Sequence, residues 1–368
     1  MRNACLIVTE TANVRIHEHA ERILDAFSSG GFVFAECRVL ALSDKSAVSA
    51  AFIDLKQAND NVVAIVDKNR LNVLRETLKE TFNHDYFQGT ATGAGTYEEN
   101  GKTLFLLAGD CAESGADYAR AVCVPYLYKK YGTRYEKMVL RSVGAKSGYV
   151  EELMGRAREI GGGKIAVFRK KRYDEDIIEI FYDGNTPKML ADDVLRLFAD
   201  GLQDSLYAIG DTTLEEQLVQ LLKLRGKKIS VAESFTGGGV ARRIVSVSGA
   251  SEVYVEGLNT YAELSKIKRL GVSDYTLRTA GAVSDQTAYE MAAGLLSSGD
   301  CDLAIATTGL AGPNSDKSGL PVGLCYVAVG YGDKVYVCRY KFSGSREEIT
   351  EKAIQYALFL ACRQLKNT

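Results

Sequence analysis

The sequence predicts an α/β protein with more than one sheet. Short apolar segments alternate with helical patterns over residues 1–110 and again after residue 208, which is typical of parallel, doubly wound sheets. Between them, over residues 135–207, strands follow one another more closely and indicate a small α+β segment. A chain of 368 residues is long enough for two or three domains.

The N-terminal part is expected to hold strands at residues 4–8, 32–40, 62–66 and 102–107, with helices at 20–27, 47–55, 71–82 and 118–128. The loops after the first and third strands begin at Thr9 and Asp67 and contain no glycine. A loop without glycine cannot easily fold its amides around a phosphate. The glycine-rich stretch Gln88–Gly95 is interpreted as a flexible connection and not as a nucleotide site.

The middle part is expected to hold strands at 137–141, 164–168 and 176–181, with helices at 149–160 and 188–198. Its basic run Arg169–Arg172 is followed at once by Asp174, Glu175, Asp176 and Glu179. This mixture of charges favours a solvated strand end over a nucleic-acid site. Residues 206–211 are interpreted as a linker.

The C-terminal part is expected to begin with a helix capped by the box Thr212–Glu215. A strand at 229–232 leads to Ser234, and Thr236 is interpreted as the N-cap of a helix that follows three glycines. Further strands are expected at 251–261, 301–307, 323–329 and 335–342, and a helix begins at Ser284. A second box, Ser345–Glu348, starts the last helix and places Arg346 in its first turn.

Composition excludes several classes of function. The net charge is −2, so no basic field is available for nucleic acid or a membrane surface. No apolar run is long enough for a signal peptide or a membrane helix. The eight cysteines lack C-x-x-C spacing, and we interpret them as small buried side chains in a reducing cytosol, not as disulfides or zinc ligands.

The histidines exclude two further kinds of site. The only three are His17, His19 and His84, and we expect all of them to be solvated. A Ser-His-Asp triad or a histidine-ligated metal site therefore cannot be built within the C-terminal part.

Ser234 lies where a nucleophile and an anion site could meet. The first turn of a helix has free backbone N–H groups and partial positive charge, and glycine allows a ligand to approach them. The turns at 234–239, 307–313 and 343–346 would form a phosphate or carboxylate pocket if they converge. The base that activates Ser234 must then be lysine or tyrosine, and Tyr261 and Lys266 are the candidates. The alternative is an ordinary helix start, a strand tyrosine and a solvated lysine.

Six separated motifs carry a resemblance to a known family. They are Glu233–Gly238, Thr260-Tyr261 with Lys266, Gly281–Ser284, Thr308–Pro313, Pro321–Leu324 and Phe342–Arg346. In this order and spacing they resemble the CinA family over residues 208–368, whose C-terminal domain is a nicotinamide mononucleotide amidohydrolase.

The resemblance implies hydrolysis of the carboxamide of nicotinamide mononucleotide to nicotinic acid mononucleotide and ammonia, as part of pyridine nucleotide salvage. It implies Ser234 as nucleophile and Lys266 and Tyr261 as proton-transfer partners. The implied substrate-binding residues are Thr236, Gly237, Gly238, Thr308, Gly309, Gly312 and Arg346. The oxyanion would bind backbone N–H groups of the 236–238 turn or of Thr308 and Gly309. The family is bacterial and cytoplasmic and implies a homodimer, no metal and no cofactor.

Two positions depart from the family pattern. Phe235 stands where the family usually has cysteine and adds bulk beside the nucleophile, and Thr350 stands where a second arginine is usual. An alternative function is therefore a non-catalytic nucleotide-binding or interaction protein with the same fold, linked to competence or DNA damage.

The remaining chain also resembles a long CinA-type protein. We expect a molybdopterin-binding-like domain at residues 1–134, a KH-like unit at 135–207 and the CinA-type domain at 208–368. In the first domain the family's glycine-rich functional loops are replaced by Thr9–Asn13, Asp67–Leu71 and Ala108–Cys111. The hypothesis is that its metal-dependent ADP-ribose pyrophosphatase is lost and that the domain has a structural or dimerisation role.

Overall fold

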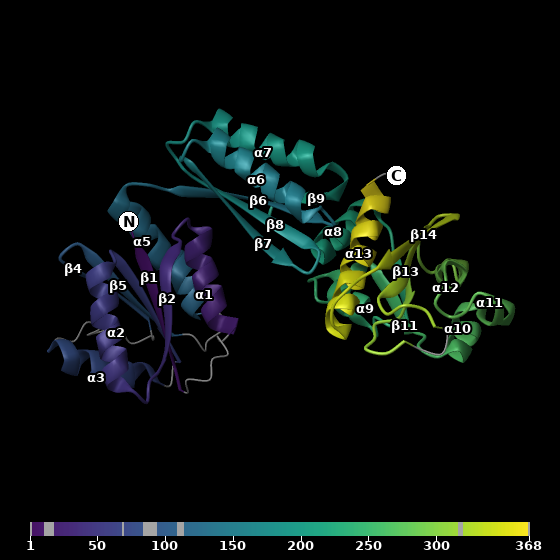
Figure 1. Ribbon diagram of the computed structural model, residues 1–368, viewed down its shortest axis with the longest axis horizontal. Helices are drawn as coiled ribbons and strands as arrows, with labels where there is room; N and C mark the ends of the chain where they lie inside the picture. The colour runs from purple at the N-terminus through teal and green to yellow at the C-terminus, as the bar shows by residue number, and fades with distance from the viewer. Residues whose placement is uncertain are drawn as a thin grey trace. The chain divides into compact units, whose positions relative to one another are not determined.

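The computed structural model describes residues 2–10, 18–67, 70–83, 94–108, 114–315 and 319–366. They form two compact units, one of Met1–Lys137 with Phe181–Pro187 and one of Met138–Ile180 with Lys188–Thr368 (Figure 1). The predicted α/β class is confirmed, because helices alternate with strands and both five-stranded sheets contain parallel strands. The division into domains at residues 134 and 207 stays a prediction.

The first unit is built on a five-stranded sheet in the order β2-β1-β3-β5-β4, in which only β4 runs antiparallel to its neighbour. The strands are β1 (Asn3–Thr9), β2 (Phe34–Ala41), β3 (Asn61–Val66), β4 (Ala94–Glu99) and β5 (Lys102–Ala108). The helices are α1 (Glu18–Ser29), α2 (Lys45–Ala58), α3 (Leu71–Phe82), α4 (Ser114–Tyr118) and α5 (Val124–Tyr131).

Both faces of this sheet are covered because the central strands are apolar on both sides. In β1, Leu6 and Val8 pack with α2 and α3, while Cys5 and Ile7 pack on the opposite face with α1 and the α4–α5 region. This arrangement is the doubly wound layering that uninterrupted apolar strands predict.

Two details of this unit differ from the predictions. Strand β4 was not predicted, and it includes Ala94 and Gly95, the end of the stretch interpreted as a flexible connection. Residues 88–93 of that stretch lie outside the described residues. The helix predicted at 118–128 is divided into α4, a π-helical segment at Ala119–Cys123 and α5. His17, His84 and Cys111, and the side chain of His19, also lie outside what the structure describes.

The second unit begins with most of a four-stranded sheet in the order β7-β8-β6-β9. Its elements are β6 (Tyr135–Val143), α6 (Ser147–Gly161), β7 (Ile165–Arg172), β8 (Glu175–Asp183), α7 (Lys188–Leu202) and β9 (Leu206–Ile209), and α6 and α7 lie side by side (Figure 1). The predicted linker at 206–211 is wrong, because Leu206–Ile209 pairs with β6 as an antiparallel strand. Its partner is more than sixty residues away in the chain, so local sequence gave no sign of the pairing.

The same unit contains a second five-stranded sheet in the order β11-β10-β12-β13-β14. Strands β11, β10 and β12 are parallel, and β13 and β14 are antiparallel. The strands are β10 (Ile229–Glu233), β11 (Tyr254–Asn259), β12 (Leu303–Gly309), β13 (Leu324–Tyr331) and β14 (Lys334–Lys341).

Helices cover both faces of this sheet. One face packs against α8 (Leu214–Arg225), α9 (Gly239–Val245) and α13 (Arg346–Lys366). The other packs against α10 (Glu263–Leu270), α11 (Asp274–Thr279) and α12 (Asp285–Ser297).

The predicted helix caps are confirmed in part. Ser284 caps α12 and Ser345 forms its box with Glu348. The box of α8 joins Thr213 to Glu216, one residue later than predicted. Gly238, with φ of 95°, is the N-cap of α9, so the prediction of Thr236 at that position is wrong.

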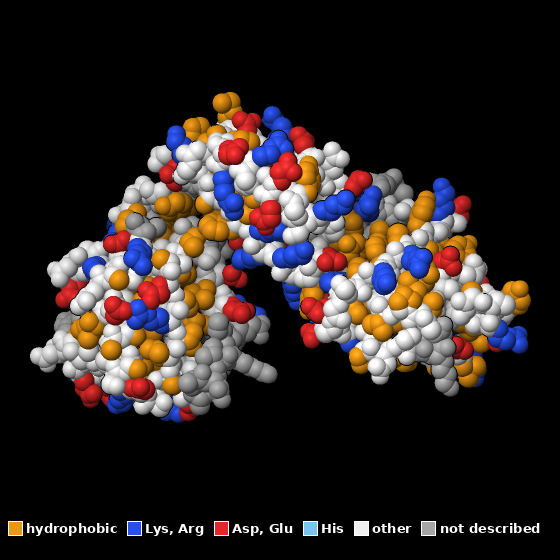
Figure 2. Space-filling model, viewed as in Figure 1, with side chains coloured by type: hydrophobic (Ala, Val, Ile, Leu, Met, Phe, Trp, Pro, Cys, Tyr) orange, Lys and Arg blue, Asp and Glu red, His pale blue; other side chains and the backbone are white. Residues whose placement is uncertain are grey.

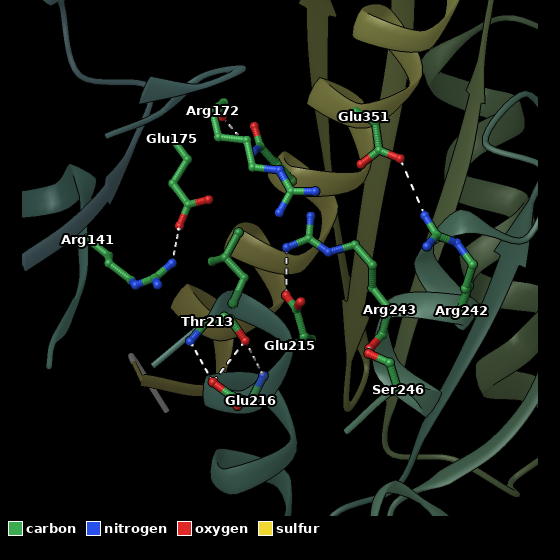
Figure 3. A network of polar contacts seen from close by, with 12 residues as sticks. Arg141, Arg172, Glu175, Thr213, Glu215, Glu216, Arg242, Arg243, Ser246 and Glu351 are labelled. Carbon is green, nitrogen blue, oxygen red and sulfur yellow. Dashed lines mark hydrogen bonds and ion pairs between the residues drawn. The ribbon is translucent and has the colours of Figure 1, made fainter. Parts of the chain in front are cut away.

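A polar network joins the small α+β segment to the C-terminal sheet within the second unit (Figure 3). Within the α+β segment Arg141 of β6 pairs with Glu175 at 3.1 Å, and within the C-terminal part Arg243 of α9 pairs with Glu215 at 2.6 Å. Gln355 of α13 donates to the Arg172 carbonyl at 2.9 Å and accepts from the Asp174 amide at 3.2 Å. The β7–β8 turn is thereby fastened to α13, whose first residue is Arg346.

Charged side chains of both signs are interspersed on the face shown in Figure 2, in keeping with the net charge of −2. Arg169 pairs with Glu151 and Asp176 at 2.6 and 2.7 Å, so part of the basic run is neutralised. None of the helices among the described residues has the length and apolar character needed to cross a membrane.

Candidate active site

The candidate site lies at the carboxyl ends of three adjacent parallel strands. Glu233, the last residue of β10, is in register with Asn259 of β11 and Thr307 of β12. The segments that follow these strands therefore meet at one edge of the sheet, which is the usual ligand edge of open α/β sheets. Ser234 and Lys266 come from the segments after β10 and β11, and Thr308 is the second-last residue of β12.

Ser234 and Lys266 are in direct contact. Nζ of Lys266 lies 3.1 Å from Oγ of Ser234. Only 8% of Ser234 and 1% of Lys266 are exposed. A lysine so deeply buried beside a serine hydroxyl is not the solvated helix lysine of the alternative interpretation.

Burial changes the ionisation of this lysine. Removal from water disfavours the ammonium form and lowers the pKa of Lys266 from its ordinary 10.5 to about 8, although the Glu263 carboxylate acts in the opposite direction. A substantial fraction of Lys266 is therefore a neutral amine at mildly alkaline pH, as a general base must be.

Two backbone carbonyls orient the amine of Lys266. The Nζ atom donates to the carbonyl oxygen of Thr260 at 2.7 Å and lies 3.4 Å from that of Tyr261. A neutral amine has two N–H donors and one lone pair. With both donors on these carbonyls, the lone pair faces the hydroxyl of Ser234.

Glu233 organises the turn that carries the serine. Its buried carboxylate accepts hydrogen bonds from the amides of Gly238, Val240 and Ala241 at 3.0, 3.1 and 2.8 Å. An internal anion thus occupies the start of α9, where the sequence suggested a site for the substrate's own anion. No sequence reasoning identified this role for Glu233.

The Glu233 bonds leave few amides in the turn for an oxyanion. The amide of Gly237 donates to the Ser234 carbonyl at 3.1 Å, and that of Gly238 is held by Glu233. Within the described part of the chain, the amides of Phe235 and Thr236 have no hydrogen-bond partner. They directly follow the nucleophile, a position from which backbone amides stabilise oxyanions in acyl transfer.

The two glycines still leave room for a ligand. Gly237 and Gly238 have φ of 61° and 95°, and a Cβ atom built on either meets no atom within 4 Å. A substrate could therefore lie against the backbone of these glycines, but their amides would not donate hydrogen bonds to it.

The predicted hydroxyl residues have internal partners. Thr236 shares a 2.6 Å hydrogen bond with the hydroxyl of Thr307, and the Thr308 hydroxyl donates to the Ala282 carbonyl at 2.6 Å. These bonds fix the ends of β10 and β12 beside Ser234.

The turn that contains Gly312 is also in contact with α13. The guanidinium of Arg346 donates to the carbonyl of Gly312 at 2.6 Å. Arg346 is exposed and carries a positive charge at this turn. Gly309 packs tightly against the neighbouring strand β13, because a Cβ atom at this position would lie 2.4 Å from Cβ of Cys325.

Tyr261 is not brought to the nucleophile. Its side chain is 66% exposed, and among the described residues its hydroxyl has no polar contact with Ser234 or Lys266. Only its backbone carbonyl lies near the lysine.

Phe235 does not fill the space beside the serine. It is 7% exposed and packs with Ala311, Phe342 and Ile349 in an apolar cluster under α13. The bulk noted in the sequence is directed into the protein core. Thr350, at the other unusual position, lies one turn after Arg346 on α13.

Sequence reasoning missed the supporting residues Glu233, Thr260 and Thr307. Thr260 supplies the carbonyl that orients the amine, and its amide donates to the Glu233 carbonyl at 2.8 Å. A buried carboxylate placed immediately before a glycine-rich turn was the available signal. No cluster of potential metal ligands is found in the described ranges.

Comparisons with known proteins agree with the resemblance. Residues 211–365 match the family described as the CinA C-terminal domain. The chain is 36% identical over 286 residues to a CinA-like protein of Kosmotoga olearia, covering 76% of this chain and 68% of the relative.

Two solved structures match part of the chain. The competence/damage inducible protein CihA of Agrobacterium tumefaciens is 34% identical and matches with a TM-score of 0.40, over 42% of this chain and 93% of that one. A competence-damaged protein (CinA) superfamily protein of Klebsiella pneumoniae is 29% identical, with a TM-score of 0.41, over 42% of this chain and 97% of that one.

Proposed function

The chain belongs to the CinA family, and we propose that its C-terminal domain hydrolyses the carboxamide of nicotinamide mononucleotide to nicotinic acid mononucleotide and ammonia. The observation that carries the proposal is the buried contact between Nζ of Lys266 and Oγ of Ser234 at 3.1 Å. A serine hydroxyl attacks an amide only when a base takes its proton, and no histidine follows residue 84.

In the first step neutral Lys266 accepts the proton of Ser234 while Oγ attacks the carboxamide carbon. The carbonyls of Thr260 and Tyr261 hold the two amine protons, so the lone pair is available to the hydroxyl. The same carbonyls then stabilise the ammonium that forms, because each accepts a hydrogen bond from it.

The tetrahedral intermediate places negative charge on the former carbonyl oxygen. We assign its stabilisation to the amides of Phe235 and Thr236, which no described group occupies. Amides held in place before the reaction stabilise such charge strongly, and removal of one donor typically costs about 10²–10³ in kcat. Glu233 keeps the turn in position through its three amide contacts.

Collapse of the intermediate breaks the C–N bond, and Lys266 returns the proton to the leaving amine to give ammonia. The acyl group then remains on Ser234 as an ester. Lys266, neutral again, takes a proton from water, and attack of the hydroxide on the ester releases the carboxylic acid product.

We assign substrate binding to the groups around this centre. Arg346 supplies positive charge suited to the phosphate, and Gly312, Thr308 and Gly309 form the adjoining turn. Gly237 and Gly238 give open backbone against which a ligand can lie. We further propose that Tyr261, which is exposed in this conformation, covers the bound substrate and shares proton transfer only if its ring turns inward.

The test is ammonia release from nicotinamide mononucleotide by the purified full chain, beside the variant Ser234→Ala. The proposal expects release by the wild type and its loss in a folded variant, since alanine provides no nucleophile. Tight binding of the nucleotide without ammonia release would favour the second candidate, a non-catalytic nucleotide-binding protein.

For the first unit we propose a structural or dimerisation role without pyrophosphatase activity. Glu10, directly after β1, forms an ion pair with Arg70 beyond β3, so charged side chains of this chain meet at the edge where a doubly wound sheet binds ligands. Mg²⁺-dependent cleavage of ADP-ribose by the wild type would refute this role. We also propose a cytoplasmic homodimer that does not bind nucleic acid, to be measured by light scattering with and without RNA.

A further inference from the structure

Two cysteines of the first unit form a direct pair. Cys5 of β1 and Cys37 of β2 are register partners in adjacent parallel strands. Because they are in register on parallel strands, their side chains project to the same face of the sheet. Register partners lie about 4.8 Å apart across a sheet, within the Cα separation of about 4.4–6.8 Å that a disulfide spans.

The two thiols differ in accessibility. Cys5 is fully buried in the central strand, whereas Cys37 is exposed on β2, which is an edge strand. A reagent from solution therefore reaches Cys37 first, and the only thiol in contact with Cys37 among the described residues is that of Cys5.

The pKa values of the two thiols also differ. The S–H group of Cys5 donates to the sulfur of Cys37, which lowers the pKa of Cys37 from its ordinary value to about 7. The same bond, together with burial, raises the pKa of the Cys5 thiol. At neutral pH a large fraction of Cys37 is therefore thiolate beside a protonated Cys5, a typical arrangement of a reactive and a resolving cysteine.

We propose that Cys37 and Cys5 form a peroxide-sensitive modification site, in which Cys37 is oxidised first and Cys5 closes a reversible disulfide between β1 and β2. Cys37 thiolate attacks one oxygen of the hydroperoxide, the O–O bond breaks, and the leaving oxygen takes a proton and departs as water or alcohol. The sulfur of Cys5 then attacks Cys37 sulfenic acid, and the proton of Cys5 leaves with the hydroxyl group as water. Two thiols lose two electrons in total, and the peroxide gains them.

The first experiment treats the folded full chain with hydrogen peroxide and maps peptides by mass spectrometry without reduction. The expected product is a Cys5–Cys37 peptide pair, lighter by two hydrogens and restored by dithiothreitol. In Cys5→Ala the expected product is Cys37 sulfenic acid, trapped with dimedone. Cys338, half-buried on β14, is the internal control and is expected to remain a thiol.

The second experiment measures alkylation of Cys37 by iodoacetamide in the wild type and in Cys5→Ala at pH 7 and pH 9.5. At pH 7 the wild type should react about threefold faster, because it has more thiolate and this gain exceeds the loss of nucleophilicity that accompanies a lower pKa. At pH 9.5 Cys37 is mostly thiolate in both proteins, and Cys5→Ala should then react faster than the wild type. A purely structural effect of the alanine would not reverse the order with pH.

Peroxide treatment that gives no Cys5–Cys37 link, a link between two copies of Cys37, or Cys37 sulfinic acid instead of the disulfide would overturn the proposal. So would equal alkylation of Cys37 in both proteins at both pH values. Because disulfide mapping uses the wild type, the proposal can be tested even if Cys5→Ala fails to fold.

Discussion

Glu233→Gln tests how the nucleophile turn is held together. One carboxylate oxygen accepts from the amides of Gly238 and Val240, and the other accepts from Ala241. Glutamine can keep the first two bonds through its amide oxygen, but its NH₂ group then faces the Ala241 amide. Donor would meet donor at a buried position.

The magnitude follows from these contacts. A buried amide without a partner costs about 1–3 kcal/mol, and loss of the charge from the two remaining bonds costs about 1 kcal/mol each. The free energy of unfolding should therefore fall by roughly 3–5 kcal/mol. Because the same turn carries Ser234, we also expect kcat to fall by about 10²-fold through misplacement of the nucleophile.

The assay is urea unfolding together with ammonia release, with Glu256→Gln as the matched control. Glu256 lies on the neighbouring strand β11, is exposed, and should change stability by less than about 0.5 kcal/mol. The reasoning is refuted if Glu233→Gln unfolds at the same urea concentration as the wild type and keeps its activity.

Five further substitutions, taken as three comparisons, have defined outcomes. Gly309→Ala should destabilise by about 1–3 kcal/mol, because the new Cβ would overlap Cys325, while Gly155→Ala, with open space in α6, should stabilise by about 0.5–1 kcal/mol; equal urea midpoints for the two would contradict this. Phe235→Cys should lower the free energy of unfolding by about 2–4 kcal/mol without raising kcat, since the ring fills core space, and a large gain in ammonia release would show instead that the ring had closed the site. Tyr261→Phe should lower kcat less than about tenfold and Lys266→Met more than about 10²-fold, and the reverse ranking in steady-state kinetics would make Tyr261 the principal base.

The elements that sequence predicted well are those with strong periodicity. The apolar strands β1, β3 and β10, and the helix starts at Ser284 and Ser345, follow from local pattern and capping chemistry. Ser234 was found because a strand, a hydroxyl and a glycine turn follow one another in the chain. Its contact with Lys266 requires residues thirty-two positions apart to meet. The lack of histidine makes Lys266 a candidate base beside Tyr261, and the resemblance implies both, but neither predicts the direct contact.

Other features depend on tertiary contacts that local sequence does not encode. A glycine-rich turn has the same sequence whether its amides are free or held by Glu233, so the occupied start of α9 could not be predicted. Local sequence predicts a linker where β9 lies, because the pairing of this strand with β6 is long-range. The exposure of Tyr261 and the inward direction of Phe235 likewise depend on which surfaces the fold covers.

The central claim is that a neutral Lys266 activates Ser234, and the most direct test is the pH dependence of single-turnover acylation with nicotinamide mononucleotide. Because burial lowers the pKa of Lys266 to about 8 and only the deprotonated amine is the base, the rate should rise with pH through about 8 and then level off. Lys266→Met should abolish that rise. A wild-type rate that stays constant between pH 6 and 9 would contradict the account.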